Sequence, residues 1–364
     1  MKFLFRHFKF IFFLYDNYEK SEMLIRRFKF YFDNTITVIP IKYSKFIFIF
    51  FYCIPVFKIY SINKLINLRK NIFSKFWFNI NPNQNPQDAW VYHTILNFYF
   101  PPNVSLFKNK FIIAIREIQR IKKQKTYVFG TGASLDLATN LITNDGYVVV
   151  CNTIVKDKVL WKYLDPDIIV AGDALYHFSD SNFAQKFRKD LIKCLENTLK
   201  TYFIFPSFFA PFLFQFIPEN LHNRLIGIPP GTHKDISVDL INNFELPSSG
   251  NVLSYLLFPI SATLSNRLYL FGFDGRANTD KNFWKNSDKH FYNDEVDELK
   301  ENHPAFFELF LPSNNGLKYN NTFFGDTLEK ALQMAEGKGF YIEMMHNSHT
   351  IPLQRRVKNF NAVK

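Results

Sequence analysis

The side chains best suited to chemistry follow short apolar runs that are typical of β-strands. The clearest group is Gly130-Thr-Gly132-Ala-Ser134, directly after the run 126–129. Glycines let a backbone approach a ligand closely, and the N–H groups at the start of a helix favour phosphate. The third glycine of the dinucleotide fingerprint is missing, and Asn152 stands where that fingerprint expects an acidic residue. The turn therefore predicts a mononucleotide phosphate site rather than an NAD site, or a tight turn without a ligand.

Two further strand ends carry polar side chains. Asn152 follows the second apolar run, where its amide would contact a base or a ribose, or only close a turn. Asp173 follows the third run and would bind a sugar hydroxyl or cap a helix. Asp165-Pro-Asp167 has the spacing of a metal-binding DxD sequence but precedes its strand, so we predict a turn there and no metal site.

Polar groups also flank the next helix and strand. Ser249-Gly250 precedes a predicted apolar helix, where hydroxyl and N–H groups would bind an anion or a hydroxyl, or only cap the helix. Asp274 ends the following strand and would hold a ribose or orient Arg276. The guanidinium of Arg276 would pair with a phosphate through two hydrogen bonds.

A polar and aromatic stretch, 277–304, follows Arg276 and contains His290 and His303. A loop of this length beside a site is typical of a lid. Each histidine is a candidate base, although most histidines are not catalytic. The chain has no GxSxG, HExxH or Walker sequence.

From residue 126 onward, predicted strands alternate with predicted helices. The strands are expected at 126–129, 146–151, 167–171, 201–205, 224–228, 267–271 and 339–344. Helices are expected at 107–125, 155–164, 183–199, 251–264 and 327–336. This order predicts an α/β fold with a mostly parallel sheet and helices on both faces. Ligands of such sheets bind beyond the carboxyl ends of the strands, where the polar residues above are expected.

Charge and phenylalanine are unevenly distributed along the chain. The 364 residues include 45 Phe and carry a net charge of +12. Residues 1–125 hold 21 Lys and Arg against 6 Asp and Glu, together with 21 Phe, whereas 126–364 carry −3. We therefore predict a basic, Phe-rich N-terminal region at 1–125 and a separate body at 126–364. The three cysteines lack CxxC spacing, which excludes a disulfide scaffold and favours a reducing compartment.

The N-terminal region is expected to meet an anionic membrane surface without crossing the membrane. Its best apolar run, 46–57, is shorter than the roughly 20 residues that a spanning helix needs. Lys42, Lys45 and Lys58 flank that run, as in interfacial segments. The alternative is a Phe-rich helical subdomain, 1–80, that covers the body. Nucleic acid is not an expected partner because no recognised binding module accompanies the basic residues.

The ordered set of motifs resembles one family, the bacterial sialyltransferases of glycosyltransferase family 42. It is also similar to the related Maf flagellin-glycosylation and MptE-like proteins. The resemblance covers about 126–353 and implies a Rossmann-like core that binds a nucleotide-sugar donor. The donor contacts that it implies are Gly130, Gly132, Ser134, Asn152, Asp173, Ser249, Gly250 and Asp274.

The resemblance also implies a reaction. A sialic-acid-like sugar would pass from a CMP-linked donor to a hydroxyl of a glycan or glycolipid acceptor, without metal or cofactor. Arg276 stands where the sialyltransferases place a tyrosine on the leaving phosphate, and an arginine stabilises the same charge. His303 is the first candidate for the base and His290 the second. Such an enzyme would be cytoplasmic and peripheral at the inner face of the membrane.

Two other functions remain open. An MptE-like pterin diphosphokinase would use ATP and Mg²⁺, with Asp173 and Asp274 as metal ligands. A non-catalytic nucleotide-binding protein at the membrane surface would retain the same strand-end residues without turnover.

Overall fold

The main body of the protein is built on one seven-stranded sheet. The structure is a computed structural model that describes residues 10–15, 22–32, 36–42, 56–58, 79–233, 235–277, 288–310 and 325–358. The strand order is β10-β9-β4-β5-β6-β7-β8, and every neighbouring pair is parallel. The strands are β4 (Thr126–Phe129), β5 (Tyr147–Cys151), β6 (Ile168–Val170), β7 (Tyr202–Pro206), β8 (Leu225–Ile228), β9 (Arg267–Phe271) and β10 (Tyr341–Met344).

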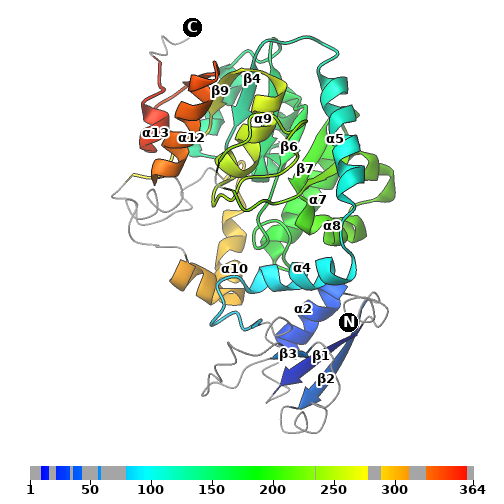
Figure 1. The fold of residues 1–364 in the computed structure, drawn as a ribbon. Helices are drawn as coiled ribbons and strands as arrows, with labels where there is room; N and C mark the ends of the chain where they lie inside the picture. The colour runs from blue at the N-terminus through cyan, green and yellow to red at the C-terminus, as the bar shows by residue number, and fades with distance from the viewer. Residues whose placement is uncertain are drawn as a thin grey trace.

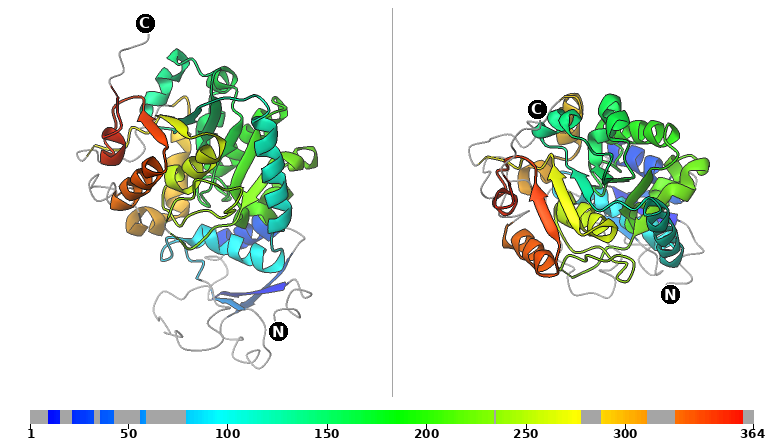
Figure 2. Two further views of the ribbon diagram at one scale, coloured as in Figure 1. Left: turned by 45° about the horizontal axis from the view of Figure 1, so that its top comes forward. Right: turned by 90° about the horizontal axis from the view of Figure 1, so that it is seen from above.

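The seven strands confirm the pattern predicted from the sequence. β4, β5 and β6 consist almost entirely of β-branched and aromatic residues, and every one of their residues is buried. Burial on both sides is typical of parallel strands that helices cover on two faces. The helices do lie on both faces of the sheet (Figure 2). The predicted α/β class with a mostly parallel sheet is therefore confirmed.

Helices connect the strands and bury an apolar stripe against them. The α-helices of the body are α5 (Val104–Ile118), α6 (Lys158–Leu164), α7 (Asn182–Glu196), α8 (Ala210–Phe216), α9 (Phe258–Leu264), α10 (Val296–Asn302), α12 (Gly325–Gly337) and α13 (Ile351–Gln354). Helix α7 shows the principle. Its N-cap Ser181 accepts a hydrogen bond from the N–H of Ala184, and Phe183, Phe187 and Leu191 are buried on one stripe.

Shorter helical turns lie at several strand ends. The 3₁₀ turns include η4 (Ala133–Asn140) after β4, η5 (Asn152–Lys156) after β5 and η6 (Ser207–Phe209) after β7. Two segments are π-helical, η8 (Leu253–Leu257), which runs into α9, and η10 (Phe306–Phe310), which follows α10. A π-turn is rare and is often found at functional sites.

The order of the strands creates a switch point between β4 and β9. The chain starts the sheet at β4 and proceeds outward to β8, then returns to add β9 on the other side of β4. The connections that leave β4 and β9 therefore continue to opposite sides, one toward β5 and the other toward β10. Open α/β sheets bind their ligands at such a point.

The N-terminal region forms a second, smaller sheet and a helix that packs on the body. Strands β1 (Phe10–Tyr15), β2 (Thr37–Lys42) and β3 (Val56–Lys58) pair in parallel in the order β2-β1-β3. Helix α2 (Glu22–Phe32) contacts α4 (Asp88–Tyr99), which borders the body (Figure 1). The alternative of a purely helical subdomain is therefore wrong in its secondary structure.

The hydrophobic core crosses the predicted boundary at residue 125. Phe28 and Tyr31 of α2, Tyr92 of α4 and Phe111 of α5 are all buried in the same core as the strands. Among the residues that the structure describes, every helix is too short or too polar to cross a bilayer. Most of the apolar run 46–57 lies outside the described residues. The division into 1–125 and 126–364 stays a prediction.

Candidate functional site

Two glycine turns meet at the switch point, one after β4 and one after β9. The N–H of Gly130 donates to the carbonyl of Phe271 at 2.7 Å, and the N–H of Gly132 donates to that of Gly272 at 2.8 Å. Gly272 has φ +77°, and a Cβ on it would lie 2.3 Å from the carbonyl oxygen of Gly130. A larger residue would therefore force the turns apart. Gly130 and Gly132 follow β4 at its carboxyl end, as the sequence predicted, and contact between the turns already requires their small size.

The carboxylate of Asp274 already holds Ser134 at the start of η4. It accepts the backbone N–H of Ser134 at 3.1 Å and lies 2.9 Å from the Ser134 hydroxyl. A Cβ on Gly132 would lie 2.1 Å from the same carboxylate, so this approach needs a glycine. The sequence predicted a phosphate site at this turn and helix start, and the family resemblance implied that Ser134 contacts the donor. In the structure Asp274 fills that place, and its negative charge would repel phosphate.

Asn152 is strained and incompletely paired. It follows β5 with φ 51°, in the left-handed region that is costly for residues with a side chain, by about 1 kcal/mol or more. Its side-chain oxygen is buried and has no hydrogen-bond partner among the described residues. A buried acceptor without a partner costs about 1–3 kcal/mol unless a ligand or water satisfies it. Both features favour the predicted ligand contact over a simple turn.

His290 lies beside the first glycine turn. Its side chain is fully buried, and its Nδ1 is 3.5 Å from the Asp136 carboxylate. Neither ring nitrogen makes a hydrogen bond to another described residue. Burial lowers the pKa of His290, although the carboxylates of Asp136 and Asp274 and the backbone of Gly132 oppose this shift. The imidazole is therefore neutral at pH 7, with a ring nitrogen able to accept a proton.

The segment that carries His290 is fixed by a lysine from η5. Nζ of Lys156 donates to the carbonyl oxygen of Phe291 at 2.6 Å and also to that of Asp288. Because Lys156 belongs to the same 3₁₀ turn as Asn152, the two candidate residues are positioned by one element. Part of the predicted lid, 278–287, lies outside the described residues.

Arg276 is buried at the start of that segment. It follows Gly275, whose φ of +71° brings the chain against Thr350. Ser249 and Gly250 lie ahead of η8 as predicted, and the hydroxyl of Ser249 is 2.6 Å from that of Ser254. Asn251 caps this helix by accepting the N–H of Ser254. The phosphate role of Arg276 and the donor contact of Ser249 stay predictions.

Asp173 follows β6 and caps the next turn. Its Oδ1 accepts the N–H groups of Leu175 and Tyr176 at 2.7 and 2.9 Å, as the simple capping interpretation expects. Burial raises the pKa of Asp173, and the two backbone donors and His303 oppose that shift. The Asp165-Pro-Asp167 sequence is a turn, with Asp165 at φ 43° and Asp167 accepting the N–H of Val148.

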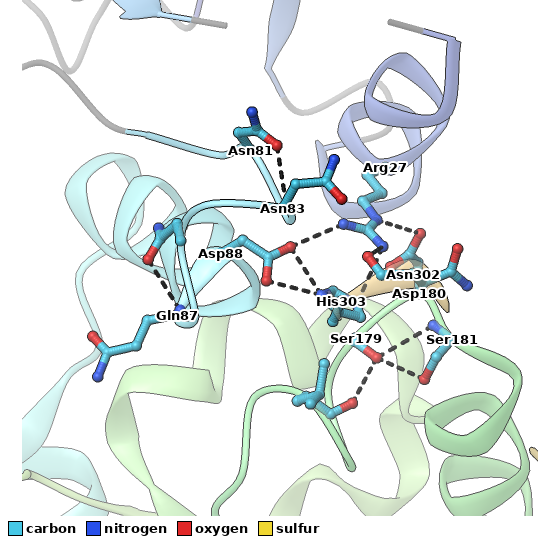
Figure 3. Close-up of polar contacts among 12 residues, drawn as sticks. Arg27, Asn81, Asn83, Gln87, Asp88, Ser179, Asp180, Ser181, Asn302 and His303 are labelled. Carbon is cyan, nitrogen blue, oxygen red and sulfur yellow. Dashed lines mark hydrogen bonds and ion pairs between the residues drawn. The ribbon is translucent and has the colours of Figure 1, made fainter. Parts of the chain in front are cut away.

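His303 lies in a buried polar network that joins the N-terminal region to the body. We call this network, made of Arg27, Asp88, Asp180, Asn302 and His303, the Arg27 junction (Figure 3). Nδ1 of His303 is 2.8 Å from Asp88, and its Nε2 is 3.2 Å from an NH₂ group of Arg27. Arg27 only donates, so Nε2 accepts and Nδ1 carries the proton. Both ring nitrogens are thus engaged in this arrangement.

The remaining contacts of Arg27 complete the junction. Its guanidinium donates to Asp88 at 2.9 Å, to Asp180 at 3.2 Å and to the carbonyl of Asn302 at 2.8 Å. The side chains of Arg27 and Asp88 are almost wholly buried. The junction covers the half of the carboxyl edge near β6 and β7, because Asp180 follows β6 and α4 packs on η6 after β7.

Sequence reasoning missed five residues of these two regions: Arg27, Asp88, Asp180, Asn302 and His346. Arg27 and Asp88 carried no motif, and their pairing spans 61 residues. His346 follows β10 and lies 2.8 Å from the hydroxyl of Ser134. The only available signal was that His346, like the predicted residues, comes shortly after a predicted strand.

The described residues therefore fall into two groups. The first group, which we call the strand-end site, lies over β9, β4 and β5. It consists of Gly130, Gly132, Ser134, Asp274, His290 and, after β5, Asn152. The second group is His303, which belongs to the Arg27 junction, and Asp173, which lies close enough to His303 to interact with it electrostatically. Among the described residues, no group of three His, Cys, Asp or Glu side chains is arranged to hold a metal ion.

Comparison with known proteins adds only a distant likeness. No protein-family model matches the chain, and no curated protein is significantly similar to it. Among solved structures, the sialyltransferase CST-II in complex with CMP matches 66% of this chain and 89% of its own chain. The sequence identity is 16% and the TM-score is 0.37. At this distance the match supports no functional conclusion by itself.

Proposed function

We propose that this protein is a glycosyltransferase that moves a sugar from a nucleotide-linked donor to an acceptor hydroxyl. The observation that carries the proposal is the strand-end site. A buried, neutral His290 lies there at the turn after β4, with neither ring nitrogen paired in a hydrogen bond. Asn152, at φ 51° and with an unpaired amide oxygen, follows the neighbouring strand β5. Unsatisfied and strained groups at the switch point of an α/β sheet are what a ligand is expected to complete.

The reaction uses His290 as the general base. A ring nitrogen of His290 takes the proton of the acceptor hydroxyl while that oxygen bonds to the anomeric carbon of the sugar. The bond between the sugar and the nucleotide phosphate breaks, and its electron pair leaves with the phosphate. Arg276 stabilises the charge that develops on the phosphate oxygens. His290 replaces His303 as the first candidate because the Arg27 junction occupies both ring nitrogens of His303.

The motif order that resembles family 42 favours a CMP-linked, sialic-acid-like donor and a glycan or glycolipid acceptor. It also favours turnover without a metal ion. Calorimetry against CMP, UDP and ATP, with a transferase assay in EDTA, tests these points together. We expect CMP to bind and activity to survive EDTA. Failure of all three nucleotides to bind would overturn the proposal and favour a non-catalytic protein at the membrane surface.

The pterin diphosphokinase fits the geometry less well. It requires Asp173 and Asp274 to hold the same metal ion. These residues leave β6 and β9, and β4 and β5 lie between those strands. Strands are spaced by about 4.8 Å, so the two backbones are roughly 14 Å apart, beyond the reach of two carboxylates on one ion. Binding of ATP that depends on Mg²⁺, without CMP binding, would reverse this choice.

We propose further that the protein is peripheral at the inner face of the membrane. The basic N-terminal region supports this location through its net charge of +15. A variant with Lys42, Lys45 and Lys58 changed to Gln tests it in full-length protein. Each lysine near an anionic surface contributes roughly 1 kcal/mol, so binding to phosphatidylserine vesicles should weaken about 100-fold. Unchanged vesicle binding would contradict this location.

A further inference from the structure

His346 connects the two glycine turns of the strand-end site. It lies two residues beyond β10, and its side chain is only 16% exposed. Its Nε2 is 2.9 Å from the backbone N–H donor of Gly272 and 2.8 Å from the Ser134 hydroxyl. One ring nitrogen thus contacts the turn after β9 and the turn after β4. A fourth strand of the sheet, β10, thereby contributes to the site.

The contacts of His346 define its tautomer. The N–H of Gly272 can only donate, so Nε2 must be an unprotonated acceptor. Nδ1 then carries the proton and donates to the carbonyl of Asn347 at 2.7 Å. The ring also packs edge-on against Phe271, with centroids 4.9 Å apart and planes at 76°. These contacts leave the imidazole little freedom to rotate.

The hydroxyl of Ser134 lies between two acceptors. Its oxygen is 2.9 Å from the Asp274 carboxylate and 2.8 Å from Nε2 of His346. Because Nε2 already accepts the N–H of Gly272, the single hydroxyl proton of Ser134 is donated to the Asp274 carboxylate. A lone pair on the Ser134 oxygen remains, and it accepts a hydrogen bond from a ligand group that can donate. A sugar or ribose hydroxyl donates, whereas a phosphate dianion does not.

We propose that His346 is a positioning residue that holds Ser134 and Asp274 as a binding pair for a hydroxyl of the donor. This inference rests on the proposed function. The Asp274 carboxylate, which already takes the N–H of Ser134, repels phosphate from this corner. The phosphate belongs instead at Arg276, on the same turn as Asp274. The hydroxyl-binding pair and the phosphate-binding arginine together orient one nucleotide.

The same contacts exclude a nucleophilic role for Ser134. A serine nucleophile needs the lone pair of its histidine for its own proton, but Nε2 already accepts the N–H of Gly272. The Ser134 N–H, which would stabilise an oxyanion, is taken by Asp274. His346 therefore acts through position rather than by proton transfer.

Calorimetry with CMP on the full-length chain tests the role of His346. His346→Ala should weaken CMP binding at least tenfold, because the turn after β9 loses the acceptor of the Gly272 N–H and the Ser134 hydroxyl loses its contact with Nε2. His346→Gln should stay within about threefold of the wild type, since its side-chain oxygen can accept from Gly272. His349→Ala is the matched control, an exposed histidine three residues away, and should bind like the wild type. Wild-type affinity in His346→Ala would overturn the inference.

Ribose analogues identify the bound group. CMP lacking the 2′- or the 3′-hydroxyl should bind the wild type more weakly than CMP does. For one of these two analogues, the loss of affinity relative to CMP should be smaller in His346→Ala than in the wild type. A loss of equal size in both proteins would show that His346 does not act on a ribose hydroxyl. Donor analogues lacking single sugar hydroxyls extend the comparison in the same way, and equal losses throughout would overturn the inference.

Nitrogen-15 NMR separates failure of this inference from failure of the proposed function. If the wild type binds no nucleotide, the proposed function fails. The His346 ring should nevertheless show an unprotonated Nε2 and a protonated Nδ1, and the Gly272 amide should exchange faster in His346→Ala than in His346→Gln. A protonated Nε2, or equal exchange in both variants, would overturn the positioning role in either case.

Discussion

The carboxyl edge of the sheet has two halves that differ in how their polar groups are satisfied. In the Arg27 junction, near β6 and β7, the guanidinium of Arg27 has four partners and both ring nitrogens of His303 are engaged. In the strand-end site, over β9, β4 and β5, His290 and the Asn152 amide oxygen make no hydrogen bond to a described residue. Asn152 is also strained.

We interpret this difference as a division between residues that stabilise the fold, in the Arg27 junction, and residues that bind a ligand, in the strand-end site. Buried polar groups in a native structure are nearly always paired, so an unpaired and strained set indicates a function. Apart from Oδ1 of Asp180, which is buried without a hydrogen-bond partner, the Arg27 junction is a paired set that stabilises one arrangement of the chain. Two histidines of the same predicted lid therefore receive opposite interpretations, His303 as part of the fold and His290 as the base.

The largest expected effect is the loss of unfolding free energy in Arg27→Met, which tests whether the Arg27 junction stabilises the fold. The change leaves the buried carboxylate of Asp88 and the partly exposed carboxylate of Asp180 without their cation, which costs about 3–5 kcal/mol of unfolding free energy. Urea denaturation measures it. Arg26→Met is the matched control, because Arg26 is exposed on the same helix and should change stability by less than about 0.5 kcal/mol. Equal midpoints for the two variants would contradict the structural role of the junction.

The next test compares alanine variants of the two histidines, His290 and His303. His290→Ala should lower kcat by about 10²- to 10⁴-fold, the usual contribution of a general base, with little change in thermal midpoint. His303→Ala should lower the thermal midpoint because Asp88 and Arg27 lose a partner. Its folded fraction should keep most of its activity. The opposite pattern would return the base assignment to His303.

Acid should destabilise the junction half of the edge through His93 of α4. Burial lowers the pKa of His93 from 6.5 to about 3, so the folded state keeps this ring neutral. Between pH 6.5 and pH 3 the unfolded chain therefore binds a proton that the folded chain does not. Unfolding free energy should fall with decreasing pH by up to about 1.4 kcal/mol per pH unit from this group.

Unfolding free energies at pH 7 and pH 5 measure this contribution. His93→Gln should show a smaller fall between the two values than the wild type, because the glutamine does not titrate. The exposed His349→Gln should fall as the wild type does. If His93→Gln loses as much unfolding free energy between pH 7 and pH 5 as the wild type, the acid sensitivity comes from another group.

The smallest effect concerns the strain at Asn152. Glycine adopts φ 51° without steric cost, so Asn152→Gly should raise the unfolding free energy by about 1 kcal/mol and weaken nucleotide binding. Asp165→Gly is the matched control at a second left-handed position, φ 43°, and should raise stability without changing binding. Stronger nucleotide binding by Asn152→Gly would show that the strain does not serve the ligand.

The sequence alone predicted all seven strands of the main sheet and the polar residues at their ends. Apolar runs such as 147–151, bounded by turn residues, predict buried parallel strands because only such strands are apolar on both faces. It also placed Gly130, Ser134, Asn152 and Asp274 at the carboxyl edge. It did not predict α2 or the N-terminal strands as elements, because that region lacks a clear period.

Only the tertiary structure decided which of these residues meet. The position of β9 beside β4 brings Asp274 onto Ser134 across 140 residues and adds His346 from β10. Hydrogen bonding then distinguishes His290 from His303, since both rings are buried but only the ring nitrogens of His303 contact Asp88 and Arg27. Local sequence determines secondary structure through period and turn chemistry, whereas strand order and long-range packing determine which side chains share a site.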